Sequence, residues 1–182
     1  MLDKTQAWQV LREADPVCSE QEVSRAVERV GAEITAMLAD SNPLVLSVMG
    51  GAVVFTGRLL PLLCFPLQLD YLHVTRYDGK TRGSEVRWKA GPRTDIRGRT
   101  LLVVDDILDE GGTLAAVRDR LMADGAAAFF SAVFADKDLG RPKPIRPDFV
   151  GVTVPDRYVF GFGMDVEEAW RNLPAIYALK DG

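Results

Sequence analysis

The sequence predicts an α/β fold of three layers, in which helices cover both faces of a central, mostly parallel sheet. Two short apolar runs, 44–49 and 100–104, each lead into a turn that contains two glycines. Apolar residues at helical spacing follow these turns, over 52–63 and 113–123, and a third apolar run fills 127–135. Apolar strands that alternate with helices are typical of parallel βαβ units, because such a sheet is buried on both faces.

The first element predicted along the chain is an amphipathic helix over 20–39. Ser19 and Glu22 stand at the spacing of a capping box, and apolar residues recur at helical intervals after them. Asn42 and Pro43 end this helix, since proline cannot continue a helical hydrogen-bond ladder. The strand at 44–49 follows directly.

The middle of the chain predicts two further strands, at 67–75 and 85–90. A long, charged, glycine-bearing segment at 76–84 separates them. Residues alternate in character over the second strand, as is typical of a strand that has one face toward solvent. After the buried strand at 127–135, a proline-rich loop at 141–147 leads to the last apolar runs.

The composition is that of an ordinary globular protein: of 182 residues, 47% are hydrophobic and 26% are charged. A chain of this length fits one domain and can bury a core without disulfides or metal ions. The net charge of −4 disfavours a protein whose main task is to hold nucleic acid. Cys18 and Cys64 lack the paired spacing of a zinc site or a disulfide framework, which favours a reducing, cytoplasmic location.

No segment has the pattern of a secretion signal or a membrane span. Residues 1–10 carry charges where a signal peptide needs an apolar stretch. Among the longest apolar stretches is 126–135, which is far shorter than the roughly 20 residues of a membrane helix. We therefore expect a soluble protein without a membrane partner.

Unusual residues stand at three predicted strand ends. They are Met49-Gly50-Gly51, Asp105-Asp106 and Asp136-Lys137. Ligands of open α/β sheets bind beyond the carboxyl ends of the strands. We therefore expect these three ends to face one crevice.

The turn after 100–104 combines acids with a phosphate-binding pattern. Helix-dipole preference explains Asp109 or Glu110, but not the neighbouring pair Asp105 and Asp106, whose carboxylates repel each other. Such a pair persists best beside a metal ion, sugar hydroxyls or a basic partner. The glycines that follow, with free N–H groups at a helix start and the Thr113 hydroxyl, form an anion site. A ribose 5-phosphate would fit both halves.

Several familiar nucleotide motifs are absent from the sequence. It contains no G-x-x-x-x-G-K-[ST], which excludes a Walker A site, and no G-x-G-x-x-G after a strand, which excludes a typical dinucleotide fold. A response-regulator receiver would need on the order of 100 residues after its first acidic pair, and too few follow residue 106.

The stretch VVDDILDEGGT, residues 103–113, resembles the phosphoribosyl-pyrophosphate signature of type I phosphoribosyltransferases. Residues 147–165, together with WRNLP at 170–174, are similar to the C-terminal hood of hypoxanthine-guanine phosphoribosyltransferases. The similarity spans about residues 44–177. It implies a single domain over 1–182, with a core at about 40–140 and a small hood built from the N-terminal and C-terminal segments, about 1–18 and 145–182.

The resemblance implies a purine-salvage enzyme. This family transfers a 5-phosphoribosyl group from phosphoribosyl pyrophosphate to N9 of hypoxanthine or guanine, which gives IMP or GMP plus pyrophosphate. The implied cofactor is Mg²⁺, and the implied assembly is a homodimer or homotetramer. Two alternatives stay open: a transferase that prefers xanthine, and a non-catalytic regulator that senses phosphoribosyl pyrophosphate.

The resemblance also implies roles for residues of the signature. Asp105 and Asp106 are expected at the ribose hydroxyls, directly or through Mg²⁺, and Asp109 is expected as the general base near purine N7. Asp165 is expected to help position the metal. The full set expected to bind phosphoribosyl pyrophosphate is Asp105, Asp106, Ile107, Asp109, Glu110, Gly111, Gly112 and Thr113.

The pyrophosphate is expected at Met49, Gly50 and Arg171. A cis peptide is typical of the family at this turn, whose second glycine is Gly51. Met49 replaces a lysine that many relatives carry, so Mg²⁺ or arginines must supply the missing positive charge. Arg157 is expected, like Arg171, to face the purine or pyrophosphate.

The purine is expected at Lys137, Tyr158, Val159 and Asp165. In the family, the lysine donates to exocyclic O6, the aromatic ring stacks on the base, and the backbone after it reads the base edge. Arg76 and Tyr77 are expected in a mobile lid over 76–84, where Arg76 replaces the usual serine. His73 receives no function.

Overall fold

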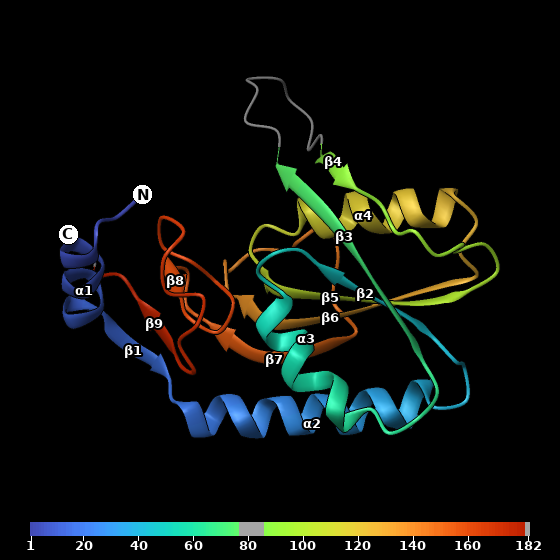
Figure 1. Ribbon diagram of the computed structural model, residues 1–182, viewed down its shortest axis with the longest axis horizontal. Coiled ribbons are helices and arrows are strands. Elements are labelled where there is room, and N and C mark those ends of the chain that lie inside the picture. The colour runs from blue at the N-terminus through green and yellow to red at the C-terminus, as the bar shows by residue number, and fades with distance from the viewer. Residues whose placement is uncertain (77–85, 181–182) are drawn as a thin grey trace.

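A six-stranded sheet with the order β4-β3-β2-β5-β6-β7 forms the centre of the protein (Figure 1). The computed structural model describes residues 1–76 and 86–180. β4 is antiparallel to β3, and the other neighbours are parallel, so the predicted mostly parallel sheet is confirmed. The strands are β2 (Leu44–Val48), β3 (Gln68–Arg76), β4 (Val86–Ala90), β5 (Thr100–Leu108), β6 (Ala128–Lys137) and β7 (Phe149–Val154).

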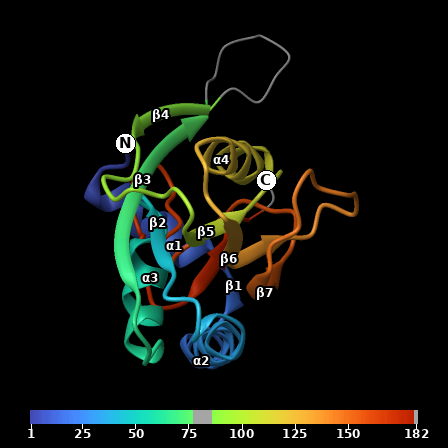
Figure 2. The same ribbon diagram turned by 90° about the vertical axis from the view of Figure 1, so that its right-hand side faces the viewer.

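Helices cover both faces of this sheet, which gives the three predicted layers (Figure 2). α2 (Glu20–Leu38) and α3 (Val53–Leu59) pack into one apolar core, while α4 (Gly112–Ala123) packs into a second core on the opposite face. The capping box predicted for α2 is present: the Ser19 N–H donates to Glu22 Oε2 at 2.8 Å. None of the described helices is both long and apolar enough to cross a bilayer.

The helix predicted over 52–63 is shorter than expected. α3 ends at Leu59, and Leu60–Leu62 continues as one 3₁₀ turn. Pro61 lies in this turn, and proline lacks the N–H that a further α-helical turn would need.

Two strands are longer than their apolar runs. β5 was predicted over 100–104 but continues to Leu108, and β6 was predicted over 127–135 but continues to Lys137. The reason is their mutual pairing, which continues to Leu108 and Asp136 and satisfies the backbone groups of both strands. The aspartates at 105 and 106 therefore lie within a strand and not after it.

A second, three-stranded sheet with the order β1-β9-β8 joins segments from both parts of the chain that were predicted to form the hood. Its strands are β1 (Asp15–Cys18), β8 (Val159–Phe160) and β9 (Ile176–Ala178). The helix α1 (Lys4–Glu13) precedes it and had not been predicted. Trp170 holds α1, because its indole Nε1 donates to the Ala7 carbonyl at 2.9 Å and its ring meets Trp8 edge-on at 5.0 Å.

Candidate active site

A cleft of about 580 Å³ opens where β2, β3 and β5 end and the hood begins. It brings together the glycine turn and the acidic turn, which are two of the three predicted strand ends, with residues of the hood. Of the third strand end, Lys137 lines an adjoining pocket and Asp136 lines neither cavity. The predicted site residues that line it are Met49, Gly50, Asp105, Asp106, Ile107, Asp109, Gly111, Thr113, Asp165 and Arg171.

A smaller pocket of about 200 Å³ adjoins this cleft. The residues that the sequence assigned to a purine gather here: Lys137, Tyr158, Val159 and Asp165. The pocket shares four residues with the cleft, and they form the common wall: Asp106, Ile107, Asp109 and Asp165. The two cavities therefore offer one long site with a narrow end between β6 and the hood.

Asp105 and Asp106 are half-buried side chains at the floor of the cleft. Burial raises the pKa of both carboxyls, and the charge of Asp106 raises the pKa of Asp105 further. Two backbone N–H groups partly compensate: Asp106 donates to Asp105 Oδ1 at 3.0 Å, and Ile107 donates to Asp106 Oδ1 at 2.9 Å. A cation beside this pair would offset both the burial and the repulsion.

These carboxylates fit a magnesium ion that is shared with a substrate. Over residues 1–76 and 86–180, no group of three or more Asp, Glu, His or Cys side chains is arranged to hold a metal. Mg²⁺ needs fewer protein ligands, since it usually binds through one or two carboxylates, waters and substrate phosphates. The Asp105–Asp106 pair supplies that set. Asp165 is less available, because its carboxylate is engaged by the hood itself.

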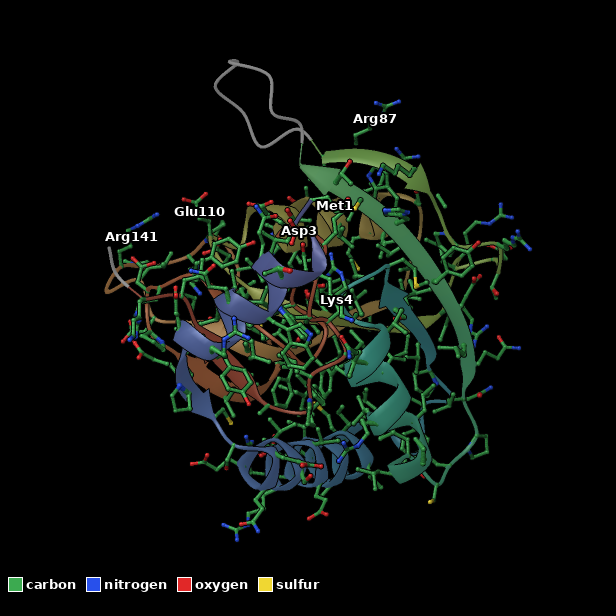
Figure 3. The ribbon with its side chains drawn as sticks, turned by 60° about the vertical axis from the view of Figure 1, so that its left-hand side comes forward. Met1, Asp3, Lys4, Arg87, Glu110 and Arg141 are labelled. Carbon is green, nitrogen blue, oxygen red and sulfur yellow. The ribbon has the colours of Figure 1, made fainter. Side chains whose placement is uncertain are left out.

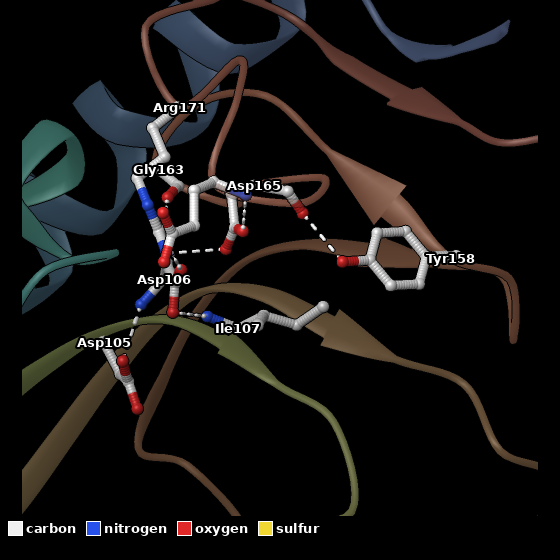
Figure 4. A network of polar contacts seen from close by, with 8 residues as sticks. Asp105, Asp106, Ile107, Tyr158, Gly163, Asp165 and Arg171 are labelled. Atoms are coloured by element: carbon white, nitrogen blue, oxygen red, sulfur yellow. Dashed lines mark hydrogen bonds and ion pairs between the residues drawn. The ribbon is translucent and has the colours of Figure 1, made fainter. Parts of the chain in front are cut away.

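Arg171 and Asp165 form a polar network in the hood that reaches β5 through Asp106 (Figure 4). Arg171 Nη2 lies 2.6 Å from Asp165 Oδ1, and its Nη1 donates to the Gly163 carbonyl at 2.7 Å. The same Nη1 lies 4.0 Å from Asp106 Oδ2, so the guanidinium connects the hood to the acidic pair. Tyr158, which is 52% exposed, donates its hydroxyl to the Asp165 carbonyl at 3.0 Å.

Two glycines allow the glycine turn, the hood and β5 to meet. A Cβ at Gly51 would overlap the Asp106 carboxylate, and a Cβ at Gly163 would overlap the Gly51 carbonyl. Gly163 also has a φ of +103°, which L side chains rarely adopt. The Met49–Gly50 peptide bond in this turn is cis, as the resemblance implied.

Asp109 and Lys137 face each other at the ends of β5 and β6. Asp109 Oδ1 lies 3.1 Å from Lys137 Nζ, and the lysine side chain is 13% exposed while that of the aspartate is 39% exposed. The expected base and the expected O6 donor are thus direct partners. A ligand that enters the small pocket meets both at once.

The helix α4 begins with the conformation of an anion site. Gly111 is its N-cap residue, with a left-handed φ of +82° and no side-chain hydrogen bond to the cap. The first N–H groups of the helix therefore receive no side-chain cap, and Gly111 and Thr113 of this turn line the cleft. Glu110 is exposed beside them, and its Oε1 lies 3.4 Å from Arg141 Nη2 (Figure 3).

The structure does not bring every expected residue to the cleft. Arg157 lies in the hood, where its Nη2 contacts Asp15 Oδ2 at 2.7 Å and the Leu179 carbonyl at 2.6 Å, so the expectation that it faces the ligand is wrong. Arg76 is the last residue of β3. Tyr77 and the rest of the expected lid, over 77–84, lie outside the described residues.

The residues that line the cleft without having been predicted include His73 and Thr75 from β3 and Lys89 from β4. The alternation of residues 85–90 is the signal that could have revealed Lys89, since it placed this lysine on the exposed face of an edge strand. Among the described residues that line the cleft, Lys89 is the one lysine and Arg171 is the one arginine.

The chain is similar in sequence to several known proteins. A model of the phosphoribosyl transferase domain matches residues 17–169. The chain is 36% identical to the hypoxanthine-guanine phosphoribosyltransferase of Bacillus subtilis, with 89% of this chain and 91% of the relative covered. It is 37% identical to the enzyme of that name from Lactococcus lactis, with 89% and 88% covered.

Solved structures give the same result. A hypoxanthine-guanine-xanthine phosphoribosyltransferase superposes with a TM-score of 0.83 at 31% identity, over 93% of this chain and 99% of the other. A hypoxanthine phosphoribosyltransferase from Trypanosoma cruzi superposes with a TM-score of 0.85 at 29% identity, over 93% and 97%.

Proposed function

Since this chain belongs to the phosphoribosyltransferase family, we propose that it transfers a 5-phosphoribosyl group from phosphoribosyl pyrophosphate to N9 of hypoxanthine or guanine. The products are IMP or GMP plus pyrophosphate, which places the enzyme in purine salvage. The observation that carries this proposal is the pair of adjoining cavities, one suited to a sugar phosphate and one to a base. Asp109 lies on their common wall, 3.1 Å from Lys137.

The donor occupies the larger cleft in this proposal. The N–H groups at the start of α4 and the Thr113 hydroxyl bind the 5-phosphate, and Asp105 and Asp106 bind the ribose hydroxyls. The backbone of the Met49–Gly50 turn meets the pyrophosphate, with Arg171 beside it. Lys89 lines the same cleft and supplies a positive charge that Met49 lacks.

The purine occupies the smaller pocket. Lys137 donates to O6, which selects a 6-oxopurine over adenine, while Tyr158 stacks on the ring and the Val159 backbone contacts its edge. As N9 forms its bond to C1′ and the bond from C1′ to the pyrophosphate oxygen breaks, Asp109 accepts the proton that leaves N7. General-base help of this kind is typically worth about 10²–10⁴-fold in rate.

We propose Mg²⁺ as the cofactor, held by Asp105 and Asp106 together with oxygens of the donor. When bound, it neutralises charge on the pyrophosphate leaving group. The raised pKa values of the two carboxyls support this assignment, because a site that disfavours paired negative charge gains most from a cation.

The decisive experiment offers four bases separately to the protein with phosphoribosyl pyrophosphate and Mg²⁺. Hypoxanthine and guanine should give nucleotide and pyrophosphate, and adenine should not react. Efficient use of xanthine in preference to both would favour the alternative specificity, which one structural relative carries in its name. Binding of phosphoribosyl pyrophosphate without turnover of any base would refute the proposed enzymatic activity and favour the regulator that senses this donor.

We also propose how the protein assembles and where it is located. Exposed apolar residues, Val53, Leu69 and Tyr71, surround a groove of about 510 Å³ on the face opposite α4, which supports self-association as a homodimer or homotetramer. Light scattering during size-exclusion chromatography tests this, and a monomer would refute it.

The free cysteines Cys18 and Cys64 support a reducing, cytoplasmic location.

A further inference from the structure

A buried lysine lies behind the Asp109–Lys137 pair, outside both cavities that form the candidate active site. Lys143 belongs to the loop that joins β6 to β7 (Figure 2), and its side chain is only 10% exposed. Its Nζ lies 2.6 Å from Asp136 Oδ1 and donates to the Leu108 carbonyl at 2.7 Å. A buried ammonium group is costly unless it is paired and hydrogen-bonded, and both conditions are met here.

The two partners of Lys143 occupy one position in the β5–β6 ladder. Leu108 and Asp136 are opposite each other in the parallel register. The next residue along the chain is Asp109, directly after β5, and Lys137, the last residue of β6. The Lys143 ammonium therefore links the two strands one residue before the pair that meets the purine.

The loop around Lys143 also contacts the phosphate turn. A Cβ added to Gly111 would lie 3.4 Å from the Lys143 Cβ and 3.3 Å from Pro144 Cδ, so the loop packs directly against this N-cap residue. This contact uses the carbon stem of Lys143, while the two polar contacts use its terminal nitrogen. Stem and nitrogen can therefore be tested separately.

We propose that Lys143 is a positioning residue, which sets the separation of Asp109 and Lys137 through Leu108 and Asp136. The proposal rests on the proposed function, since the pair matters because it binds and deprotonates the purine. Without the ammonium group, the Asp136 carboxylate and the Leu108 carbonyl lose a shared donor, and the two strand ends are free to separate. A displacement of about 1 Å at a reacting group is enough to lower a rate about 10²-fold.

The test is Lys143→Met, which keeps the stem against Gly111 and removes the ammonium group. We expect kcat/KM for hypoxanthine to fall about 10–100-fold, through both a lower kcat and a higher KM for the base. The Kd of phosphoribosyl pyrophosphate with Mg²⁺, measured by calorimetry, should stay within about threefold of wild type. Lys143→Arg, which restores a cation, should recover part of the loss.

Asp136→Asn supplies an independent variant. It should lower kcat/KM in the same way, and the double variant with Lys143→Met should lose much less than the product of the two single losses, because both changes remove one contact. Lys4→Met, an exposed lysine on α1, is the matched control and should behave as wild type.

The outcomes separate this inference from the proposed function. No turnover by the wild type would refute the proposed function itself. An active wild type with a Lys143→Met variant of equal kcat/KM would overturn the positioning role alone. If Lys143→Met lowers donor affinity, kcat/KM for the base and the melting temperature together, the lysine only stabilises the fold. That result also overturns the inference. If Lys143→Met does not fold, the same comparison with Lys143→Arg and Asp136→Asn decides.

Discussion

Asp109→Asn separates the catalytic value of this carboxylate from its structural value. The change keeps the size of the side chain and a contact to Lys137, but removes the charge that is proposed to accept a proton. Asp109 is 39% exposed and Lys137 only 13%, so the pair is partly buried. The amide oxygen of the variant can still accept a hydrogen bond from the lysine, so the loss of stability should be about 1 kcal/mol. Loss of a general base costs about 10²–10⁴-fold in rate, or about 2.7–5.4 kcal/mol of activation free energy. The catalytic effect should therefore far exceed the structural one.

The assay measures kcat with saturating hypoxanthine and phosphoribosyl pyrophosphate, together with the melting temperature and the Kd of the donor. We expect kcat to fall by at least about 100-fold, with the melting temperature and donor affinity little changed. Asp119→Asn, which removes an exposed carboxylate from α4, is the control and should leave kcat unchanged. An Asp109→Asn enzyme that retains at least a third of wild-type kcat would refute the general-base role.

Three further changes test other parts of the site. Burial raises the pKa of Asp105 in the folded state, so the contribution of this carboxyl to stability is present at low pH and is lost as pH rises through the raised pKa. Ligand-free Asp105→Asn should therefore melt at a higher temperature than wild type at pH 8 and lose this advantage below about pH 4. An unchanged melting temperature at pH 8 would contradict the burial argument. Gly51→Ala should weaken donor binding about 5- to 150-fold, because moving Asp106 off its rotamer and away from the Ile107 N–H costs about 1–3 kcal/mol. An unchanged Kd in calorimetry would reject the close-approach argument. Lys89→Met should raise the KM for phosphoribosyl pyrophosphate several-fold and leave the KM for hypoxanthine unaltered, and equal changes in both would show that Lys89 does not meet the pyrophosphate.

Local patterns in the sequence predicted the parts of the site that lie on one strand–turn–helix unit. The acids, the glycines and Thr113 all belong to residues 103–113, so their spacing alone places them together. The core strands and α2 were equally readable, since apolar periodicity and the capping box are local signals.

Features that depend on contacts between distant segments were not readable in this way. The true end of β5 is set by its pairing with β6, and the partner of the Leu108 carbonyl is a lysine 35 residues away. Arg157 was misplaced for the same reason, because its carboxylate partner, Asp15, lies 142 residues from it. The helix α1 has no fully buried residue, so its periodic apolar signal is weak and its anchor is the remote Trp170.

The hood also fixes the order in which the protein can acquire its two binding surfaces during synthesis. β9 lies between β1 and β8, so β1 leaves the ribosome early and has no sheet partner until residues 176–178 follow. The strands that carry the larger cleft are complete once β7 has emerged at residue 154. If the two cavities bind as proposed, a nascent chain gains its phosphate-binding turn first and closes its base-binding pocket last, and the surface of β1 has to be kept from other partners over that interval.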